Sequence, residues 1–570
     1  MIYVLYLLIS LLLLVPYLDF FIALHSILPP GYNLLFTILK QSIKLFMMFS
    51  IVPVFYFYFL KVGSKIYKIL FIIGFNTIYF FTFIALRLYF NYYQDTPEPS
   101  LLFASSSELW TIKEQILYQL LQPLDYWLIA LWPIVIILSF LFIKKIKLNN
   151  LKNLKLKYVT IGLLLVYTSY IGAQFIIESP AKRIDFHSTD AIRAYGITWT
   201  AAGLAYKSIR DHFCKEKTAI PYPGKISKNT VLASLPSSLL KGSNIIIIQT
   251  ESLEKLVMDK KINNVEITPF LNRLKKHSIF FEHFYSQHYG GGTSDAELST
   301  LTSLLPISDH PSFQTIVPGK VESLAHVLKR HGYTSAGFHA NYGNIFSREM
   351  GFKNLDFDKF YSANYFSGKA KGFYSWDKEF FKQSMKYIQN MPKPFFAYLI
   401  TVQSHGPFRN YHPETPSLFH FENTDYNTLE RNYISVIHEV DEAIGELFHL
   451  LDQAGLIEHT IIILFADHKS RAFNDPSIDE CIPLLICHKN LSPKTNDTIG
   501  SHVDIAPTIA HLLNIQEGKN WLGNSLFDLN QKQTIIRGED LIHKTSENKI
   551  KVEFDPSLRN YYLFSKFMVN

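Results

Sequence analysis

Three consecutive glycines precede a threonine in the run Gly-Gly-Gly-Thr-Ser-Asp-Ala-Glu at Gly290–Glu297. Glycines allow the backbone to approach a bound group closely. Ser294 and Glu297 have the spacing of a capping box, which predicts that a helix starts here with its free N–H groups and dipole facing an incoming phosphate. Thr293 and Ser294 could simply cap that helix. The other interpretation, which the rest of the chain favours, is that Thr293 is a nucleophile in phosphoryl chemistry.

Carboxylates and a histidine follow two apolar runs that have the character of buried strands. Glu251 comes shortly after the run at 244–249, and Asp467 and His468 come after the run at 460–465. These side chains offer two oxygen ligands and one nitrogen ligand, and the Thr293 oxygen could supply a fourth. Such a set suits one Zn²⁺ or Mn²⁺ ion, and Mg²⁺ is also compatible. A divalent ion there would lower the pKa of the threonine hydroxyl and polarise a phosphoryl oxygen.

Further polar residues follow two other predicted strands. His405 comes after the run at 395–400, and His339 and Asn341 come after the run at 335–338. In open α/β sheets, ligands collect outside the carboxyl ends of the strands. A single polar residue at a strand end is more often a satisfied core or capping group, but four such ends in one sheet indicate a binding site.

The sequence after about residue 224 has the pattern of a sheet that could bring these residues together. Short β-branched runs alternate with amphipathic stretches such as 269–278 and 433–451, where apolar residues recur every three or four positions. Strand and helix alternate, which predicts a doubly wound α/β domain with a mainly parallel sheet.

The cysteines exclude two kinds of site. The chain has only Cys214, Cys481 and Cys487, with no CxxC pair that would indicate a cysteine-ligated zinc. Cys481 and Cys487 stand in one apolar run, and if that run is extended their Cα atoms are about 20 Å apart, beyond the reach of a disulfide.

The chain before about residue 177 has a different composition. The 570 residues are 48% hydrophobic and 15% aromatic, and long apolar runs are concentrated in this first part. Five runs have about the length that a helix needs to cross a bilayer, so we predict a membrane domain over 1–177. The predicted spans are Tyr3–Phe21, Leu45–Leu60, Ile69–Leu86, Trp127–Ile143 and Tyr158–Ile177.

The charged residues between the spans predict the topology. The connections at 61–68 and 144–157 are rich in lysine, so both are expected in the cytoplasm, whereas the acidic connection at 95–125 is expected outside. The amino terminus is then cytoplasmic and everything after the fifth span lies outside. The formal net charge of +7 partly reflects this orientation, and we expect no nucleic-acid partner.

Two further segments flank the predicted catalytic domain. Residues 178–223 are interpreted as a linker, either an interfacial helix lying along the membrane or an ordinary packed helix, and prolines near residue 223 mark a boundary. The domain at 224–570 then includes a small β subregion from about 517, with strands expected at 549–554 and 561–567.

Several of these segments resemble, in order along the chain, the lipoteichoic acid synthase family, which is a branch of the alkaline phosphatase and sulfatase superfamily. The most specific is the Gly-Thr-Ser-Asp-Ala-Glu run, and five spans followed by an outward domain also resemble that family, so the resemblance covers nearly the whole chain. The resembling segments are Gln249–Ser252, Ile267–Pro269, Gly292–Glu297, His405 with Pro407 and Phe408, and Asp467–His468.

This resemblance implies an enzyme of the bacterial cytoplasmic membrane that transfers phosphoglycerol from phosphatidylglycerol to an acceptor hydroxyl. Diacylglycerol leaves, and a threonine-linked phosphoglycerol intermediate passes its group to a glycolipid, polymer or glycan. The implied metal ligands are Glu251, Thr293, Asp467 and His468.

The residues implied around the phosphoglycerol are less similar to the family pattern. His339, Arg348 and His405 match, with Arg348 expected to bind phosphate oxygens and His405 to act as acid or base. Asn341 and Phe346 stand where the synthases usually carry an acidic residue and a tryptophan, and Lys469 after Asp467-His468 is also unusual. The donor headgroup and the acceptor therefore stay open.

Other functions fit the sequence less well. A phosphoethanolamine transferase acting on lipid A or another envelope glycan shares the spans, the threonine and the metal ligands, but usually has a disulfide-rich outer domain. A glucan phosphoglycerol transferase shares donor and chemistry. A sulfatase would need a Cys/Ser-x-Pro-x-Arg run, and a non-catalytic membrane-anchored protein would be expected to have lost metal ligands.

A secreted phosphatase of this superfamily would need a second metal site. Its candidate ligands are His502 and Asp504. We interpret them as structural, because they begin a predicted helix in which Asp504 caps the first turn and Pro507 lies within it.

Overall fold

The computed structural model divides into two compact units, Met1–Lys215 with Asn474–Pro476, and Glu216–Phe473 with Ser477–Asn570. The expected linker at 178–223 falls mostly outside the described residues, so its bounds stay a prediction. The structure describes residues 8–10, 12–13, 56, 59–60, 64–93, 123–145, 220–227, 240–288, 292–307, 312–473, 480–527, 534–537, 540–544 and 550–569.

In the first unit, two described helices are long and apolar enough to cross a membrane, α3 (Lys65–Tyr93) and α6 (Pro123–Lys145). They contain the third and fourth predicted spans. The other three spans lie largely or wholly outside the described residues, so the count of five stays a prediction. Between the helices, Tyr56 donates to Ser139 Oγ at 2.7 Å and accepts from Asn76 Nδ2 at 2.8 Å, which satisfies buried polar groups in an apolar unit.

The second unit is built on an eight-stranded sheet with the order β10-β4-β9-β8-β1-β7-β5-β6. All neighbouring pairs are parallel except those of β9, which runs antiparallel to both β4 and β8. The prediction of a mainly parallel sheet is confirmed. The strands are β1 (Asn244–Thr250), β4 (Ile279–Tyr285), β5 (Thr334–His339), β6 (Lys359–Tyr361), β7 (Phe395–Ile400), β8 (Thr460–Ala466), β9 (Cys481–Cys487) and β10 (Lys494–Ser501), with β2 (Lys261–Ile262) and β3 (Val265–Glu266) forming a separate hairpin.

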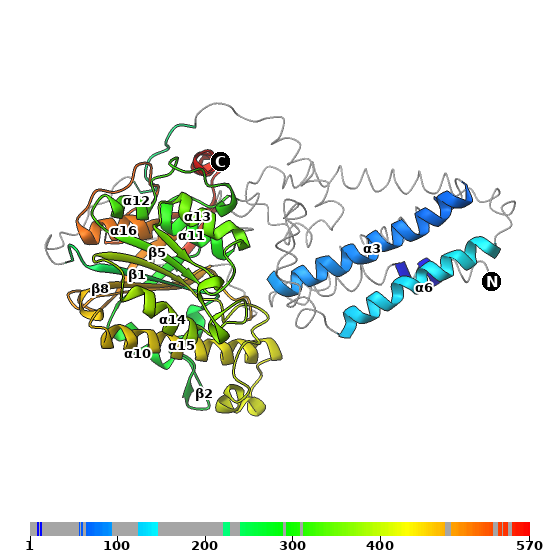
Figure 1. The fold of residues 1–570 in the computed structure, drawn as a ribbon, viewed down its shortest axis with the longest axis horizontal. Helices are drawn as coiled ribbons and strands as arrows, with labels where there is room; N and C mark the ends of the chain where they lie inside the picture. Colours follow the sequence, from blue (N-terminus) through cyan, green and yellow to red (C-terminus); the bar gives the residue numbers. More distant parts are fainter. Residues whose placement is uncertain are drawn as a thin grey trace. The chain divides into compact units, whose positions relative to one another are not determined.

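Helices cover both faces of the sheet, so its central strands are fully buried and can be continuous apolar runs (Figure 1). The longest helix, α15, begins with a capping box between Asn427 and Glu430 and is followed by Gly455, whose φ of 63° is left-handed. One face carries α10 (Pro269–Lys276), α14 (Asp377–Ile388) and α15 (Thr428–Gln453), and the other carries α11 (Thr293–Thr302), α12 (Leu324–Lys329), α13 (Arg348–Asn354) and α16 (Ile505–Leu513).

The register of the central strands decides which strand ends are neighbours. Thr250 at the end of β1 pairs with Ala466 at the end of β8, so the residues that follow each strand leave the sheet side by side. On the other side, Ile400 at the end of β7 pairs with Gln249 of β1 and with His339 of β5. Four carboxyl ends therefore meet along one edge of the sheet.

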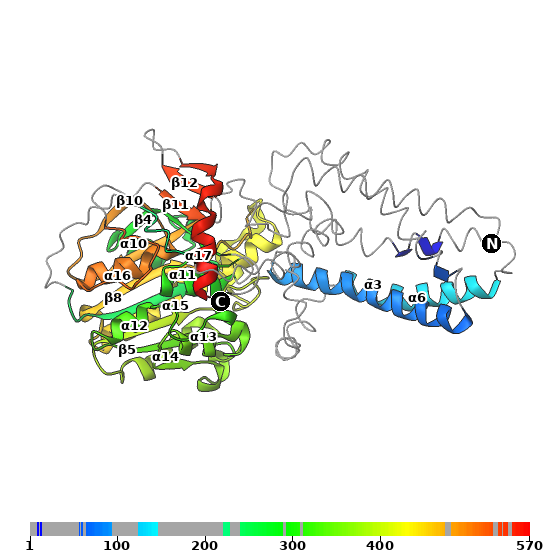
Figure 2. The same cartoon turned by 90° about the horizontal axis from the view of Figure 1, so that it is seen from above.

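The carboxyl-terminal region contains a three-stranded antiparallel sheet of β11 (Thr534–Arg537), β12 (Asp540–Lys544) and β13 (Ile550–Phe554). Ile535 and Ile542 pack with Tyr285 and Ile499, so this sheet lies against β4 and β10 (Figure 2). The expectation of a strand at 561–567 is wrong, because those residues belong to the helix α17 (Arg559–Val569). The short apolar run there had no decisive period, and its buried positions follow helical spacing.

Candidate active site

Helix α11 begins at Thr293, and its N-cap is Gly292, with φ 49° and ψ −117°. This backbone conformation favours glycine, which explains the glycine directly before the threonine. The predicted capping box is wrong: no side chain caps the helix, and both Ser294 and Glu297 are buried within it. Gly290 and Gly291 lie outside the described residues.

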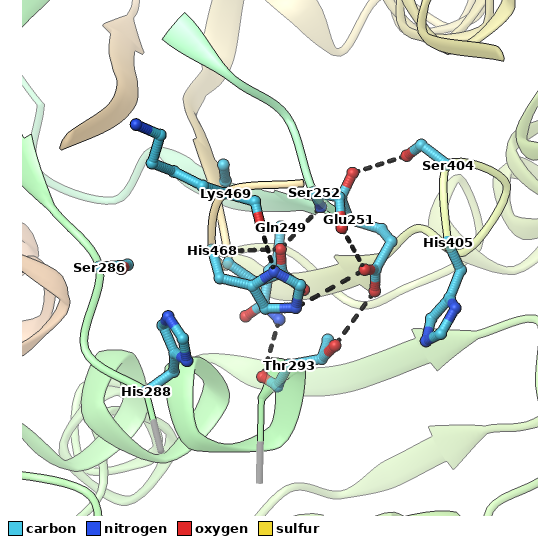
Figure 3. A network of polar contacts seen from close by, with 12 residues as sticks. Gln249, Glu251, Ser252, Ser286, His288, Thr293, Ser404, His405, His468 and Lys469 are labelled. Carbon is cyan, nitrogen blue, oxygen red and sulfur yellow. Dashed lines mark hydrogen bonds and ion pairs between the residues drawn. The ribbon is translucent and has the colours of Figure 1, made fainter. Parts of the chain in front are cut away.

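Thr293 is held against the end of β1 by two contacts (Figure 3). Its Oγ1 donates to Glu251 Oε2 at 3.1 Å, and its carbonyl oxygen accepts from Gln249 Nε2 at 3.1 Å. Gln249 Oε1 in turn accepts from the buried Tyr398 hydroxyl. The hydroxyl at the start of α11 therefore points at a carboxylate whose position the sheet fixes.

Glu251, Asp467 and His468 offer ligand atoms that all lie within 4.8 Å of one another. Asp467 Oδ1 is occupied by the backbone N–H groups of Ser252 at 2.8 Å and His468 at 2.7 Å. Asp467 Oδ2 is buried and has no hydrogen-bond partner among the described residues. One oxygen of this carboxylate thus fixes its orientation, and the other is left for a ligand.

The histidine is oriented in the same manner. His468 Nδ1 lies 3.0 Å from the carbonyl oxygen of Lys469, so Nδ1 carries the proton and the Nε2 lone pair faces the carboxylates. Nε2 is 3.5 Å from Asp467 Oδ2 and 3.7 Å from Glu251 Oε1. Three candidate ligand atoms converge, one of them the unpartnered Asp467 Oδ2, and this arrangement fits a divalent cation.

The electrostatics of the Glu251 and Asp467 carboxyl groups also fit a cation site. Burial, together with the neighbouring charge of Glu251, raises the pKa of Asp467 to about 7. Two buried carboxylates this close cannot both ionise cheaply unless a positive charge lies between them. A bound cation would satisfy that requirement.

Two further histidines border this cluster (Figure 3). His405 Nδ1 donates to the Gly406 carbonyl oxygen at 2.9 Å, its ring packs edge-on against Phe373, and burial lowers its pKa. His288 lies across the cluster, with its ring 5.3 Å from that of His468, and burial lowers its pKa to about 4.

The sequence did not single out His288 or its partner Glu480, whose Oε2 is 3.4 Å from His288 Nε2. The only signal for His288 was its place just before the glycines. The sequence held no such signal for Glu480, because this residue is far from His288 in the chain. It comes close only through the pairing of β9, which it directly precedes, with β4.

The residues expected around a phosphate form a second, buried group. Arg348 Nε donates to Glu297 Oε1 at 2.8 Å, and Nη1 lies 3.1 Å from His339 Nε2. His339 Nδ1 donates to the Ile400 carbonyl oxygen at 3.0 Å, and burial lowers the pKa of this histidine to about 3. The neutral ring therefore accepts from Arg348.

Two other expected substrate residues lie beside this group. The Phe346 ring is 5.2 Å from the Arg348 guanidinium carbon, a cation–π contact. Asn341 is buried, and its Oδ1 accepts from the adjacent Tyr342 N–H at 2.8 Å. The structure thus brings Phe346 and His339 directly onto Arg348, whereas the Asn341 side-chain oxygen is bound to the backbone N–H of the next residue, Tyr342.

His502 and Asp504 are engaged in structural contacts. His502 Nε2 donates to the Ala466 carbonyl oxygen at 2.9 Å and Nδ1 accepts from Gln287 N at 3.0 Å. The Asp504 oxygens accept from the backbone of Ser501 and Asn524. Both ring nitrogens and both carboxylate oxygens are occupied, which agrees with a structural role.

Comparison with known proteins gives relatives of the family that the sequence motifs resemble. Residues 243–515 match the Sulfatase family. The chain is 32% identical over 312 residues to the lipoteichoic acid synthase-like protein YvgJ of Bacillus subtilis, covering 50% of each chain. It is 31% identical over 330 residues to a lipoteichoic acid synthase of Staphylococcus aureus, covering 53% of this chain and 50% of the relative. The chain thus spans about half the length of the curated relatives it matches.

The solved structure of the lipoteichoic acid synthase LtaP from Listeria monocytogenes has a similar fold. The TM-score is 0.50 at 22% identity, over 60% of this chain and 94% of that one. At this identity the similarity supports the α/β fold alone.

Proposed function

We propose that this chain, which is a lipoteichoic acid synthase-like member of the alkaline phosphatase and sulfatase superfamily, is a membrane-bound phosphoglycerol transferase. The proposed reaction moves phosphoglycerol from phosphatidylglycerol to an acceptor hydroxyl on a glycolipid, polymer or glycan. The observation that carries the proposal is the Thr293 hydroxyl, which lies on Glu251 beside the convergent ligand atoms of Asp467 and His468.

Glu251, Asp467 and His468 would hold one divalent cation, with Mn²⁺ or Zn²⁺ favoured by the mixed oxygen and nitrogen ligands. When bound, the ion supplies Lewis-acid polarisation of a phosphoryl oxygen and lowers the pKa of a nearby hydroxyl. The protein contributes the orientation, because backbone contacts fix one atom of Asp467 and one of His468.

In the first half of the reaction, the Thr293 oxygen attacks phosphorus while its proton passes to Glu251 Oε2, the acceptor it already contacts. The bond between phosphorus and the diacylglycerol oxygen breaks, and that oxygen takes up the proton that Thr293 gave to Glu251, so that diacylglycerol leaves as the alcohol. Arg348 holds the phosphate oxygens.

In the second half, the acceptor hydroxyl attacks the phosphothreonine and the Thr293 oxygen leaves. His405 is suited to take the proton of the acceptor hydroxyl and pass it to the departing Thr293 oxygen, because burial favours its neutral form and leaves it able to accept a proton. The nucleophile is regenerated by protonation.

The cellular setting is part of the same proposal. The relatives are named as lipoteichoic acid synthases, and α3 and α6 are apolar enough to cross a membrane. We propose a multi-pass protein of the bacterial cytoplasmic membrane with a cytoplasmic amino terminus. The catalytic unit would then act outside, on lipids of the outer leaflet.

The test is release of diacylglycerol from labelled phosphatidylglycerol by the purified full-length chain with Mn²⁺. Thr293→Ala should reduce release by about 10³-fold or more, because a covalent nucleophile cannot be replaced by its neighbours. Ser299→Ala is the matched control, since this buried hydroxyl on the same helix has no partner among the described residues and should leave release unchanged.

Unchanged release by Thr293→Ala would overturn the assignment of the nucleophile. Mass spectrometry of the adduct trapped on Thr293 identifies the donor, because phosphoglycerol and phosphoethanolamine differ in mass. A phosphoethanolamine adduct would overturn the proposed donor while supporting the nucleophile.

A further inference from the structure

Glu297 is buried with no exposed side-chain surface, and its contact is not the helix cap that its spacing predicted. Its Oε1 accepts from Arg348 Nε at 2.8 Å, and the Arg348 side chain is itself only 3% exposed. Glu297 Oε2 has no hydrogen-bond partner among the described residues. A carboxylate that is buried and half-satisfied is costly, so a function other than filling space is expected for it.

The position of Glu297 on α11 relates it to the nucleophile. Thr293 and Glu297 are four residues apart, so their side chains leave the same face of the helix, separated by about 6 Å along its axis. The ion pair therefore anchors the Arg348 guanidinium about one helical turn from the Thr293 hydroxyl. At that separation the guanidinium can contact the oxygens of a phosphoryl group bonded to the threonine.

One edge of the Arg348 guanidinium is left for a ligand. Nε is taken by Glu297, and Nη1 contacts His339 Nε2 at 3.1 Å. His339 is fixed in turn by its bond to the Ile400 carbonyl oxygen. Nη2 donates to no protein acceptor among the described residues, and the Phe346 ring lies against the guanidinium. Glu297 and His339 thus hold two sides of a planar group.

We infer that Glu297 is a positioning residue for the proposed transferase, which fixes Arg348 so that its Nη2 edge receives the phosphoryl oxygens of the donor. The inference rests on the proposed function. His339 has the same task from the other side, since its neutral ring accepts from Arg348 through Nε2. Phosphate is then bound by a guanidinium that needs no rearrangement when the substrate arrives.

A double-mutant cycle tests this inference in the full-length chain with Mn²⁺. Glu297→Gln keeps the shape but removes the charge, and Arg348→Lys keeps the charge but removes the fork. We expect kcat/KM for phosphatidylglycerol to fall by roughly 100-fold in each single variant, the loss typical of a small misplacement. The double variant should be no worse than Arg348→Lys alone, because Glu297 acts only through Arg348.

Reductions that multiply in the double variant would overturn the inference, because Glu297 would then act independently of Arg348. The surface pair Glu322 and Arg330, 3.4 Å apart and with side chains 21% and 45% exposed, supplies the matched control, and Glu322→Gln with Arg330→Lys should leave kcat/KM unchanged. If Glu297→Gln does not fold, Glu297→Asp replaces it, because this variant keeps the charge. Its reduction of kcat/KM should be smaller and should also disappear in the Arg348→Lys background.

A second measurement separates this inference from the proposed function. The dissociation constants of glycerol 1-phosphate and inorganic phosphate are measured by calorimetry on the same four proteins. If wild type binds these anions but releases no diacylglycerol, the proposed function fails, while non-additive weakening of anion binding still supports Glu297. Equal anion binding by wild type and Glu297→Gln would overturn the inference whatever the activity.

Discussion

At the scale of single residues, the candidate metal ligands are oriented by the backbone. Asp467 directs Oδ1 to two N–H groups and His468 directs Nδ1 to a carbonyl, which leaves Oδ2 and Nε2 facing Glu251. This pre-orientation limits the entropy that a cation must overcome when it binds. It also makes the contribution of each ligand atom testable.

Asp467→Asn should weaken Mn²⁺ binding by about 10²-fold or more, because the oxygen left for the cation becomes an amide group that cannot ligate as an anion. Calorimetric titration of Mn²⁺ into chelator-treated protein measures this loss. Glu458→Gln is the control, since that carboxylate is 62% exposed and pairs with a surface lysine. Unaltered Mn²⁺ affinity in Asp467→Asn would argue against the proposed ligand set.

At the scale of elements, the site depends on how the ends of β1, β4 and β8 are tied together. His502 joins two of them, since it donates to Ala466 at the end of β8 and accepts from Gln287 just after β4. Burial lowers the pKa of His502 to about 3 from its usual 6.5. The folded protein therefore keeps this ring neutral at pH values where the unfolded chain protonates it.

His502→Asn should lower the melting temperature at pH 7.5, because two buried backbone groups lose their partner, at about 1–3 kcal/mol each. Below pH 6.5 the unfolded wild-type chain binds a proton that the folded form excludes, so wild type loses up to about 1.4 kcal/mol per pH unit. The variant lacks this loss.

The stability gap between wild type and His502→Asn should therefore narrow by about 2 kcal/mol between pH 7.5 and pH 5. Thermal melts of the detergent-solubilised full-length chain at both pH values measure the gap. His459→Asn, at an exposed position, is the control for removing an imidazole from the surface. A gap for His502→Asn that is the same at both pH values would contradict a buried neutral ring.

At the scale of the whole molecule, the chain divides into two compact units of different composition. The first contains two helices that are apolar and long enough to cross a bilayer, and the second is the α/β domain. The connections at 61–68 and 144–157 are rich in lysine and are therefore predicted to lie in the cytoplasm, on the side of the membrane opposite to the catalytic unit. This topology is required if the enzyme is to use lipids of the outer leaflet.

Labelling of single cysteines in a variant without the three natural ones tests the topology. In protoplasts or spheroplasts, a membrane-impermeant maleimide should label Ser417→Cys, at an exposed position of the catalytic unit. Asn149→Cys in the lysine-rich connection should react only after permeabilisation. Labelling of Asn149→Cys alone in intact cells would show the opposite orientation, and labelling of both positions would contradict a membrane between them.

The sequence by itself determined the elements whose signals are local. The apolar runs at 244–249, 395–400 and 460–465 became central strands because such runs suit a sheet that is covered on both faces. Polar residues directly after those runs had to leave at one sheet edge, so Glu251, Asp467 and His468 could be selected together. A helix starting near Thr293 was also predictable from the adjacent glycines, although the capping box expected of Ser294 and Glu297 does not form.

Only the tertiary structure decided which distant groups meet. Glu297 has capping-box spacing, yet its carboxylate pairs with Arg348, because burial of both side chains makes each the other's required partner. His288 and Glu480 come together through strand pairing that no local period encodes. The run at 561–567 became helical because its neighbours, and not its own ambiguous pattern, determined which side chains are buried.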